Sequence, residues 1–332
     1  MKTFLFAFGL SLSFLPHVSA QAIQCKENVA PDDCRDVDFV TPATKTETRT
    51  GCFYSKATKR KVMYSVTFPK GYRMGGQCEK PYPYVIFLHG RDNDHRHFVN
   101  AGGEREMARV LSEKGRPPFL VVAPAQPEHS YWKDGTARGK KFGTATMVSE
   151  DLIEHVESKS CVAKERCLTG ISMGGHGTMY LKMRNPEVFK NAYAIAPVFR
   201  SEKGLHECDR TAYGSGDDFN RQNPVALLKA KVRRSGRAAC CQLRAEIAAD
   251  DPFVLDRNGP ETGAAMKEMA ELCPGKFQVA GKGGHANDFF TPALGRALRF
   301  CADAFAGKVQ DEDCDPVEAA SSGSGALQPA VR

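Results

Sequence analysis

The most constraining feature of this 332-residue chain is the segment Gly170–Gly177, which reads Gly-Ile-Ser-Met-Gly-Gly-His-Gly. It follows an apolar run over 166–171 and leads into a helical pattern over 174–184. A G-x-S-x-G segment between a strand and a helix is typical of a sharp turn that lifts the serine hydroxyl above a sheet. The two outer glycines remove side chains that would collide with the neighbouring strand and helix. The segment therefore predicts Ser172 as a nucleophile at the end of a buried strand.

Short apolar runs alternate with helical patterns along most of the chain. The predicted strands are 61–68, 84–88, 119–123, 166–171, 192–196, 243–248 and 277–280, and the predicted helices are 104–114, 146–157, 174–184, 223–231, 264–272 and 287–306. This alternation predicts an α/β fold with a mostly parallel central sheet and helices on both faces. Catalytic groups are then expected directly after the strands, because active sites of such sheets lie at the carboxyl ends.

A serine hydroxyl becomes nucleophilic when a base takes its proton and a carboxylate orients that base. In folds with such a serine turn between a strand and a helix, the acid and then the histidine follow the serine along the chain. Downstream of the glycine-rich segment the chain holds only His206 and His285, and only His285 directly follows a predicted strand. The acid is expected after 243–248, where Asp250 and Asp251 are adjacent, and position alone does not separate them.

Stabilisation of the negative charge formed during such a reaction requires two backbone N–H donors. Met173, directly after the nucleophile, is one candidate, and Arg91 is the other because Gly90 lets the loop after 84–88 turn towards the site. His89 is expected to support that loop. Trp132, the only tryptophan, is predicted either to line the substrate pocket or to pack in the interior.

Neither a metal nor an organic cofactor is expected. The C-x-x-C spacing of zinc ribbons is absent. His95 and His97 lie in a polar segment and are predicted to be exposed side chains rather than metal ligands.

The first 20 residues are predicted to be a signal peptide. Met1 and Lys2 supply positive charge, 4–15 is almost wholly apolar, and small residues precede a cleavage site after Ala20. The apolar run is shorter than the roughly 20 residues that span a bilayer, so no stable membrane anchor is expected. These features predict a secreted or periplasmic protein.

The chain has 12 cysteines, all after the predicted cleavage site, and this is typical of disulfides in an oxidising compartment. The best local pair is Cys161 with Cys167. Cys240 and Cys241 are expected to have different partners, because a bridge between neighbours is strained.

The domain boundaries are predicted from these features. Residues 1–20 are the signal peptide, 21–50 a cysteine-containing extension that is irregular over 25–50, 51–314 the α/β domain and 315–332 a disordered tail. The formal charge of +7 is modest, and the basic run at 229–237 is expected to be solvated surface, so no nucleic-acid partner is expected. The oligomeric state is left open.

From about Tyr64 to Ala306 the chain resembles the putative-esterase family of α/β hydrolases, which includes esterase D-type S-formylglutathione hydrolases and secreted feruloyl and acetylxylan esterases. Gly170–Gly177 resembles the serine turn of this family, and 194–197 resembles its next strand. Asp250-Asp251-Pro252-Phe253 resembles its acidic turn, whose second aspartate is the catalytic one, so the resemblance selects Asp251. His285 falls where the family carries its base.

The resemblance implies hydrolysis of a carboxylic ester through an acyl-enzyme, without a cofactor. The expected partner is a small-molecule or polymer-linked ester, since the export signal and the cysteines do not suit a cytosolic thioester hydrolase. Two alternatives stay open: acyl transfer to a sugar hydroxyl, as in the related mycolyltransferases, and a non-catalytic binding module on the same scaffold.

Overall fold

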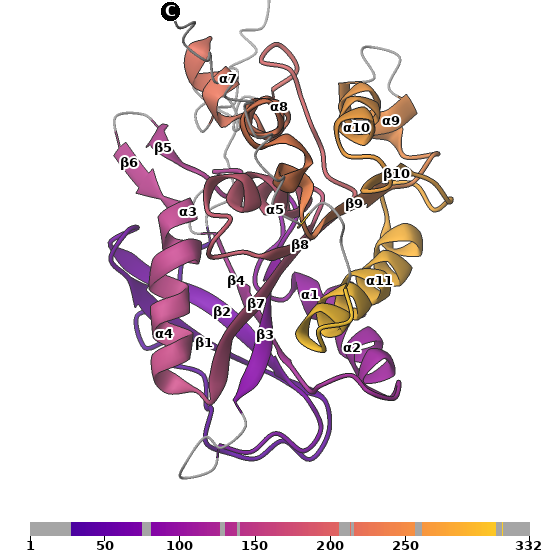
Figure 1. Ribbon diagram of the computed structural model, residues 1–332. Coiled ribbons are helices and arrows are strands. Elements are labelled where there is room, and N and C mark those ends of the chain that lie inside the picture. Colours follow the sequence, from indigo (N-terminus) through magenta and orange to yellow (C-terminus); the bar gives the residue numbers. More distant parts are fainter. Residues whose placement is uncertain are drawn as a thin grey trace, which may run out of the picture.

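The computed structural model describes residues 28–74, 81–126, 130–137, 140–205, 213, 216–255, 261–309 and 314. The predicted signal peptide, the predicted disordered tail and His206 lie outside these residues. An eight-stranded sheet in the order β1-β2-β4-β3-β7-β8-β9-β10 forms the centre of the structure (Figure 1). β1 and β2 pair antiparallel with their neighbours, and the other neighbouring strands pair parallel. The mostly parallel sheet predicted from the sequence is confirmed.

All seven predicted strands are present. Their bounds are β2 Arg60–Phe68, β3 Tyr82–Leu88, β4 Leu120–Pro124, β7 Val162–Ile171, β8 Asn191–Ile195, β9 Leu243–Ile247 and β10 Phe277–Val279. The apolar runs form strands because both of their faces are covered. In β4 all five residues are buried, and in β3 only Tyr82 is not.

The predicted helices are also present, and they cover both faces of the sheet. Their bounds are α2 Gly103–Leu111, α3 Thr144–Thr146, η1 Met147–Asp151, α4 Leu152–Lys159, α5 Met173–Arg184, α8 Pro224–Ser235, α10 Glu261–Leu272 and α11 Asn287–Phe305. Helices α2 and α11 pack together on one side, whereas α4 and α5 lie on the other (Figure 1). α8 begins as its sequence predicts: the Asn223 side chain accepts a hydrogen bond from the Val225 N–H at 2.9 Å, and Pro224 occupies the first turn.

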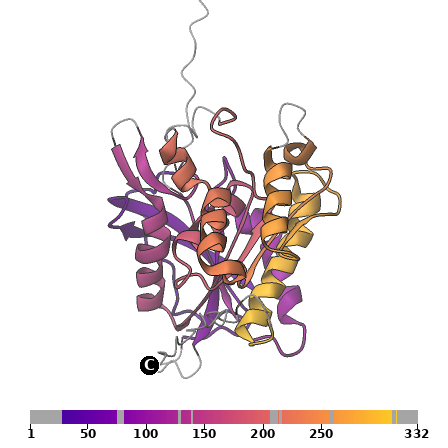
Figure 2. The same cartoon turned by 45° about the horizontal axis from the view of Figure 1, so that its top comes forward.

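Several short elements are not predicted from the sequence. They are β1 Glu47–Ser55, α1 His97–Asn100, the hairpin of β5 Asp134–Ala137 and β6 Lys140–Gly143, α7 Asp217–Gln222, η2 Gly236–Cys240 and α9 Pro252–Leu255. Figure 2, with the top of Figure 1 turned forward, shows α8 in front, between this hairpin and α10. α1, the hairpin, α7 and α9 follow β3, β4, β8 and β9 along the chain, so they lie at the carboxyl end of the sheet. β1 is the edge strand of the sheet, and η2 leads into the amino end of β9.

The expectation that residues 25–50 are irregular is wrong for residues 47–50. They begin β1, which pairs with β2 along its whole length, from Glu47 opposite Phe68 to Ser55 opposite Arg60. β1 lacks the apolar pattern of the other strands, because pairs of hydroxyl groups link part of it to β2. Thr48 Oγ1 lies 2.7 Å from Thr67 Oγ1 in one such pair.

The residues before β1 pack on the sheet. Cys34 forms a disulfide with Cys52 of β1, and the Cys52 N–H donates a hydrogen bond to the Arg35 carbonyl at 2.8 Å. Val37 and Phe39 are buried in the main hydrophobic core. Side chains on both sides of residue 51, the predicted domain boundary, therefore share one core.

The predicted disulfide between Cys161 and Cys167 is wrong. Cys167 on β7 pairs with Cys301 on α11, and Cys161 forms a different disulfide. β7 begins at Val162, so the chain from Cys161 to Cys167 is extended and the two cysteines lie too far apart for a disulfide. Cys240 and Cys241 do take different partners, since the remaining disulfides with both cysteines described are Cys240–Cys273 and Cys241–Cys314.

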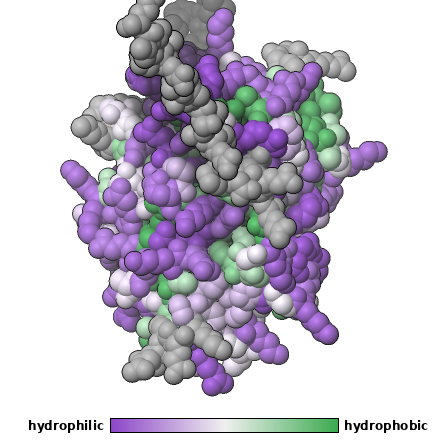
Figure 3. Space-filling model, viewed as in Figure 1, coloured by the Kyte–Doolittle hydropathy of each residue, from purple (hydrophilic) through white to green (hydrophobic). Residues whose placement is uncertain are grey.

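Among the described residues, no helix combines the length and the apolar character that a membrane crossing requires. The face shown in Figure 3 is mostly hydrophilic, with apolar residues gathered near α9 and α10. Leu255, at the end of α9, is 59% exposed there.

Candidate active site

Ser172 occupies a strained turn between β7 and α5. Its φ of 61° and ψ of −116° lie in a region that is costly for a residue with a side chain. The Ser172 N–H donates a hydrogen bond to the Ile195 carbonyl of β8 at 2.9 Å, which holds the turn to the sheet. A Cβ atom at Gly170 would lie 2.5 Å from the Gly174 carbonyl oxygen, and one at Gly174 would overlap the Leu88 carbonyl. The two glycines are needed for the steric reason that the sequence predicts.

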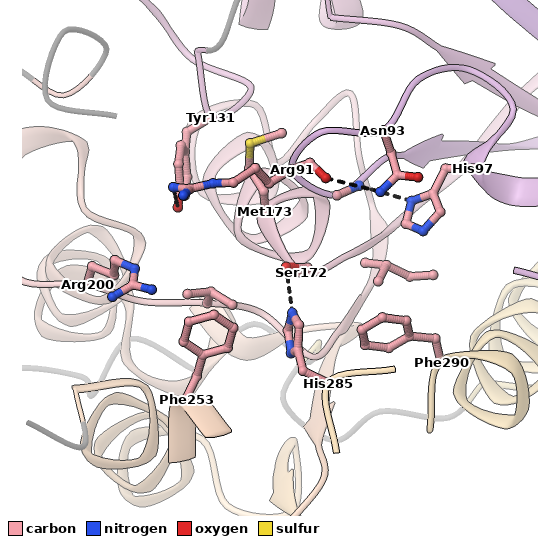
Figure 4. Close-up of a pocket in the computed structure, with 13 residues that line it drawn as sticks. Arg91, Asn93, His97, Tyr131, Ser172, Met173, Arg200, Phe253, His285 and Phe290 are labelled. Carbon is pink, nitrogen blue, oxygen red and sulfur yellow. Dashed lines mark hydrogen bonds between the residues drawn. The ribbon is translucent and has the colours of Figure 1, made fainter. Parts of the chain in front are cut away.

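Three predicted residues meet in one line of hydrogen bonds. His285 Nε2 lies 2.8 Å from Ser172 Oγ, and His285 Nδ1 lies 2.6 Å from Asp251 Oδ2 (Figure 4 shows the first of these bonds). Asp251 is fully buried, and its Oδ1 accepts a hydrogen bond from the Phe253 N–H at 2.9 Å. Because a carboxylate only accepts hydrogen bonds, Nδ1 carries the imidazole proton and Nε2 is left to accept the serine proton.

The neighbouring carboxylate, Asp250, has a different place. It is exposed, and its oxygens accept hydrogen bonds from the N–H groups of Gly283 at 3.1 Å and Gly284 at 2.9 Å. The Gly284 and Gly283 N–H groups hold the pKa of Asp250 below its usual range, since they stabilise the charged form. Asp250 thus shapes the loop that carries His285, while Asp251 contacts the imidazole itself.

Two aromatic rings hold the imidazole of His285 in place. The ring centroids of Phe253 and Phe290 lie 4.7 Å and 5.0 Å from that of His285, and both pairs are edge-to-face. Phe253 comes from α9 and Phe290 from α11, on either side of the imidazole (Figure 4). The ring orientation is therefore set by packing as well as by Asp251.

Both predicted backbone donors lie beside Ser172. Met173 is the first residue of α5, where a helix N–H has no acceptor within the helix. A Cβ atom at Gly90 would lie only 3.4 Å from the Ser172 Cβ, so the loop carrying Arg91 approaches the nucleophile closely. The Asn93 side chain donates a hydrogen bond to the Arg91 carbonyl at 3.0 Å and fixes the loop (Figure 4).

The prediction that His95 and His97 are exposed is wrong, since they are 8% and 7% exposed. His97 Nδ1 accepts a hydrogen bond from the Gly90 N–H at 3.1 Å. Burial lowers the pKa of His97 to about 4, so the ring is neutral near pH 7 and serves as an acceptor. The role of His97 cannot be predicted from the sequence, because it depends on how α1 packs against the loop that contains Gly90.

The structure gives Trp132 a packing role and no contact with the cavity. Its side chain is fully buried, its Nε1–H donates a hydrogen bond to the His89 carbonyl at 3.1 Å, and a Cβ atom at Gly177 would lie 2.6 Å from its own Cβ. The supporting role predicted for His89 is confirmed, since its Nδ1 lies 2.7 Å from the Gly90 carbonyl and its Nε2 accepts the Gln126 N–H at 3.1 Å.

A cavity of about 310 Å³ opens at Ser172 and His285. The lining residues that the sequence does not single out as site residues are Asn93, Tyr131, Val198, Arg200, Phe253 and Phe290. Val198 and Arg200 follow β8, so the rule that places sites after strands points to them. Tyr131 lies in an irregular loop and has a φ of 53°, for which the sequence gives no signal. Within the described ranges, no three histidine, cysteine or acidic side chains are arranged to hold a metal ion.

Comparison with known proteins agrees with this geometry. Residues 55–296 match the sequence profile of a family described as putative esterase. A mouse S-formylglutathione hydrolase is 25% identical over 160 residues, which cover 42% of this chain and 53% of the relative. The chain thus spans about half the length of that curated relative.

Solved structures show the same fold. A ferulic acid esterase superposes with a TM-score of 0.62 at 22% identity, covering 79% of this chain and 99% of the other. An S-formylglutathione hydrolase from Agrobacterium tumefaciens gives a TM-score of 0.63 at 16% identity, covering 81% and 99%. The architecture is that of the α/β hydrolases.

Proposed function

Because the chain belongs to the putative esterase family, we propose that it is a secreted serine carboxylesterase that acts through an acyl-enzyme. The observation that carries the proposal is the line of hydrogen bonds from Asp251 through His285 to Ser172 at the wall of a cavity. Such a line joins a nucleophile, a base and the acid that orients it.

In the first half of the proposed reaction, Ser172 Oγ attacks the ester carbonyl carbon while His285 Nε2 takes the hydroxyl proton. Asp251 stabilises the imidazolium that forms. The N–H groups of Met173 and Arg91 donate hydrogen bonds to the tetrahedral oxyanion. When the C–O bond to the alcohol breaks, the leaving oxygen takes the proton from His285, and the acyl group stays on Ser172.

In the second half, water attacks the acyl carbon and His285 takes one of its protons. The tetrahedral intermediate collapses, Ser172 Oγ recovers the proton, and the carboxylic acid leaves. Neither step requires a cofactor, since the chain supplies the nucleophile, the base and the hydrogen-bond donors.

The cysteines support export. Each cysteine among the described residues is disulfide-bonded. Disulfides persist mainly in oxidising compartments, which agrees with the predicted signal peptide.

The test is hydrolysis of 4-nitrophenyl esters, from acetate to palmitate, by the chain starting at Gln21. Ser172→Ala is expected to lower kcat by more than about 10³-fold. Ser158→Ala is the matched control, because Ser158 lies on α4 and, among the described residues, its hydroxyl donates a hydrogen bond only to the His155 carbonyl, at 2.9 Å. A Ser172→Ala variant that keeps the wild-type rate would refute the proposal.

The same assay separates the alternatives. If an added alcohol yields a new ester in place of the free acid, the enzyme is an acyltransferase. If correctly disulfide-bonded protein turns over no ester and transfers no acyl group, the chain is a binding module.

A further inference from the structure

Arg200 is a cation at the catalytic cavity without a carboxylate partner among the described residues. It follows β8, is partly buried and lines the cavity. Its guanidinium carbon lies 4.9 Å from the centre of the Phe253 ring, and its Nη1 donates only a long hydrogen bond, of 3.5 Å, to the Gly204 carbonyl. Contact with an aromatic face holds a guanidinium in position and leaves N–H groups for a ligand.

Four other partly buried arginines are paired with acids. The pairs are Arg49 with Glu47, Arg116 with Asp303, Arg166 with Glu157 and Arg299 with Glu113. Pairing offsets the cost of taking a charge out of water. Arg200 has no such acid among the described residues, so a negatively charged group that enters the cavity would offset this cost.

A second cation lies on the same side of the nucleophile. The Arg91 side chain extends towards Tyr131, whose hydroxyl lies 3.4 Å from Arg91 Nη2, on the side of Ser172 where Arg200 lies (Figure 4). Phe290 and His97 lie on the opposite side (Figure 4). One half of the cavity is therefore cationic, and the other is aromatic and uncharged.

The described residues that line the cavity include no acidic side chain. Asp251 is fully buried, with its two oxygens bonded to His285 and to the Phe253 N–H. Asp250 points to the Gly283 and Gly284 amides. The field at the mouth of the site therefore favours an anion.

We propose that the ester bound here carries an anionic group, in the simplest case a carboxylate, and that Arg200 binds it. Arg91 adds positive charge to the same half of the cavity. The uncharged part of the ester lies against Phe290. This inference rests on the proposed esterase function and adds a substrate class to it.

Two pairs of matched esters test the proposal. Mono-(4-nitrophenyl) adipate against 4-nitrophenyl hexanoate places the carboxylate on the acyl side, and 4-acetoxybenzoate against its methyl ester places it on the alcohol side. In at least one pair, kcat/KM for the anionic ester is expected to exceed that of the neutral one by about tenfold, because charge-assisted hydrogen bonds to arginine are strong. The ratio should fall as NaCl is raised, since salt screens an open site.

Arg200→Gln is expected to lower the ratio of anionic to neutral kcat/KM about tenfold or more, mainly through KM, and Arg200→Lys is expected to retain part of it. Arg184→Gln is the control. Arg184 is exposed, lies 6.0 Å from the Tyr180 ring and does not line the cavity, yet its replacement changes the net charge equally. The ratio should not change in this variant.

Equal kcat/KM within both ester pairs, or an anionic preference that Arg200→Gln leaves unchanged, would overturn the inference. If neutral esters still need Ser172 in that case, the esterase function stands by itself. Failure to hydrolyse any ester would instead remove the proposed function, and this inference with it.

Discussion

Replacing each of the two adjacent aspartates by asparagine should have very different effects. Asp251 is buried and contacts the imidazole through Oδ2, while its Oδ1 accepts the Phe253 N–H. In Asp251→Asn the amide oxygen is needed at Phe253, because only an acceptor satisfies that N–H. The amide NH₂ group then faces His285.

An NH₂ group at this position reverses the imidazole tautomer. Nδ1 becomes the acceptor, the proton moves to Nε2, and Nε2 loses the lone pair that takes the proton of Ser172 Oγ. We expect kcat to fall by about 10³- to 10⁴-fold, the scale known for the wrong tautomer in serine hydrolases. This loss corresponds to about 4 to 5.5 kcal/mol of transition-state stabilisation.

Asp250→Asn is the matched control, one residue away. Its side-chain oxygen still accepts the Gly283 and Gly284 N–H groups, and only the charge is lost. We expect less than about a tenfold fall in kcat, because weakening an exposed charged hydrogen bond costs little.

The assay is kcat with 4-nitrophenyl butyrate at pH 8, together with urea unfolding to show that both variants are folded. If Asp251→Asn keeps more than about a tenth of the wild-type kcat, the tautomer argument is refuted. Equal losses in the two variants would also refute it, because the structure gives the two carboxylates different partners.

Three further predictions concern the scaffold. Replacing Cys167 and Cys301 together by alanine opens a loop closed over 134 residues, and this should lower the free energy of unfolding by about 4 to 5 kcal/mol in urea titrations. His97→Asn keeps an acceptor for Gly90 but does not titrate. The pKa of His97 is about 4 in the folded protein, below its ordinary value of 6.5. The contribution of His97 to the free energy of unfolding is therefore fully present above pH 6.5 and is lost as the pH drops towards 4. Between pH 7 and 5 the wild type should lose about 2 kcal/mol more than the variant. Trp132→Phe loses one buried hydrogen bond and should lower the unfolding free energy by about 1 to 3 kcal/mol, leaving KM within about twofold.

Each of these predictions has a contrary outcome. An unchanged urea midpoint in the variant without the Cys167–Cys301 disulfide would show that this disulfide does not reduce the conformational entropy of the unfolded chain. Parallel stability curves against pH for wild type and His97→Asn would show that His97 titrates normally. A large rise in KM in Trp132→Phe would show that Trp132 lines the substrate pocket.

The centre of the sheet is predictable from the sequence because its strands are buried on both faces. In β3 and β4 nearly every position is apolar, so each run stands out against its polar flanks. β1 does not stand out, since Thr48 and Thr50 pair with the hydroxyl groups of Thr67 and Ser65. Its strand character depends on a partner that no local pattern reveals.

Site residues that their order along the chain identifies can be predicted from the sequence, whereas those that only their burial identifies cannot. The order serine, acid, histidine after successive strands selects Ser172 and His285. Choosing between Asp250 and Asp251 requires either the resemblance or the geometry, because the two differ only in which one is buried. Burial of His97 depends on how α1 packs, and the bridge between β7 and α11 depends on their contact in space.

The central claim is that Ser172 carries the acyl group, and covalent labelling tests it most directly. The chain would be treated with a fluorophosphonate, digested with its disulfides reduced, and analysed by mass spectrometry. We predict one adduct per chain on Ser172, no adduct in Ser172→Ala and slow labelling in His285→Ala, because the base is missing. An adduct on a different residue, or ester hydrolysis that continues with Ser172 unlabelled, would contradict the proposed mechanism.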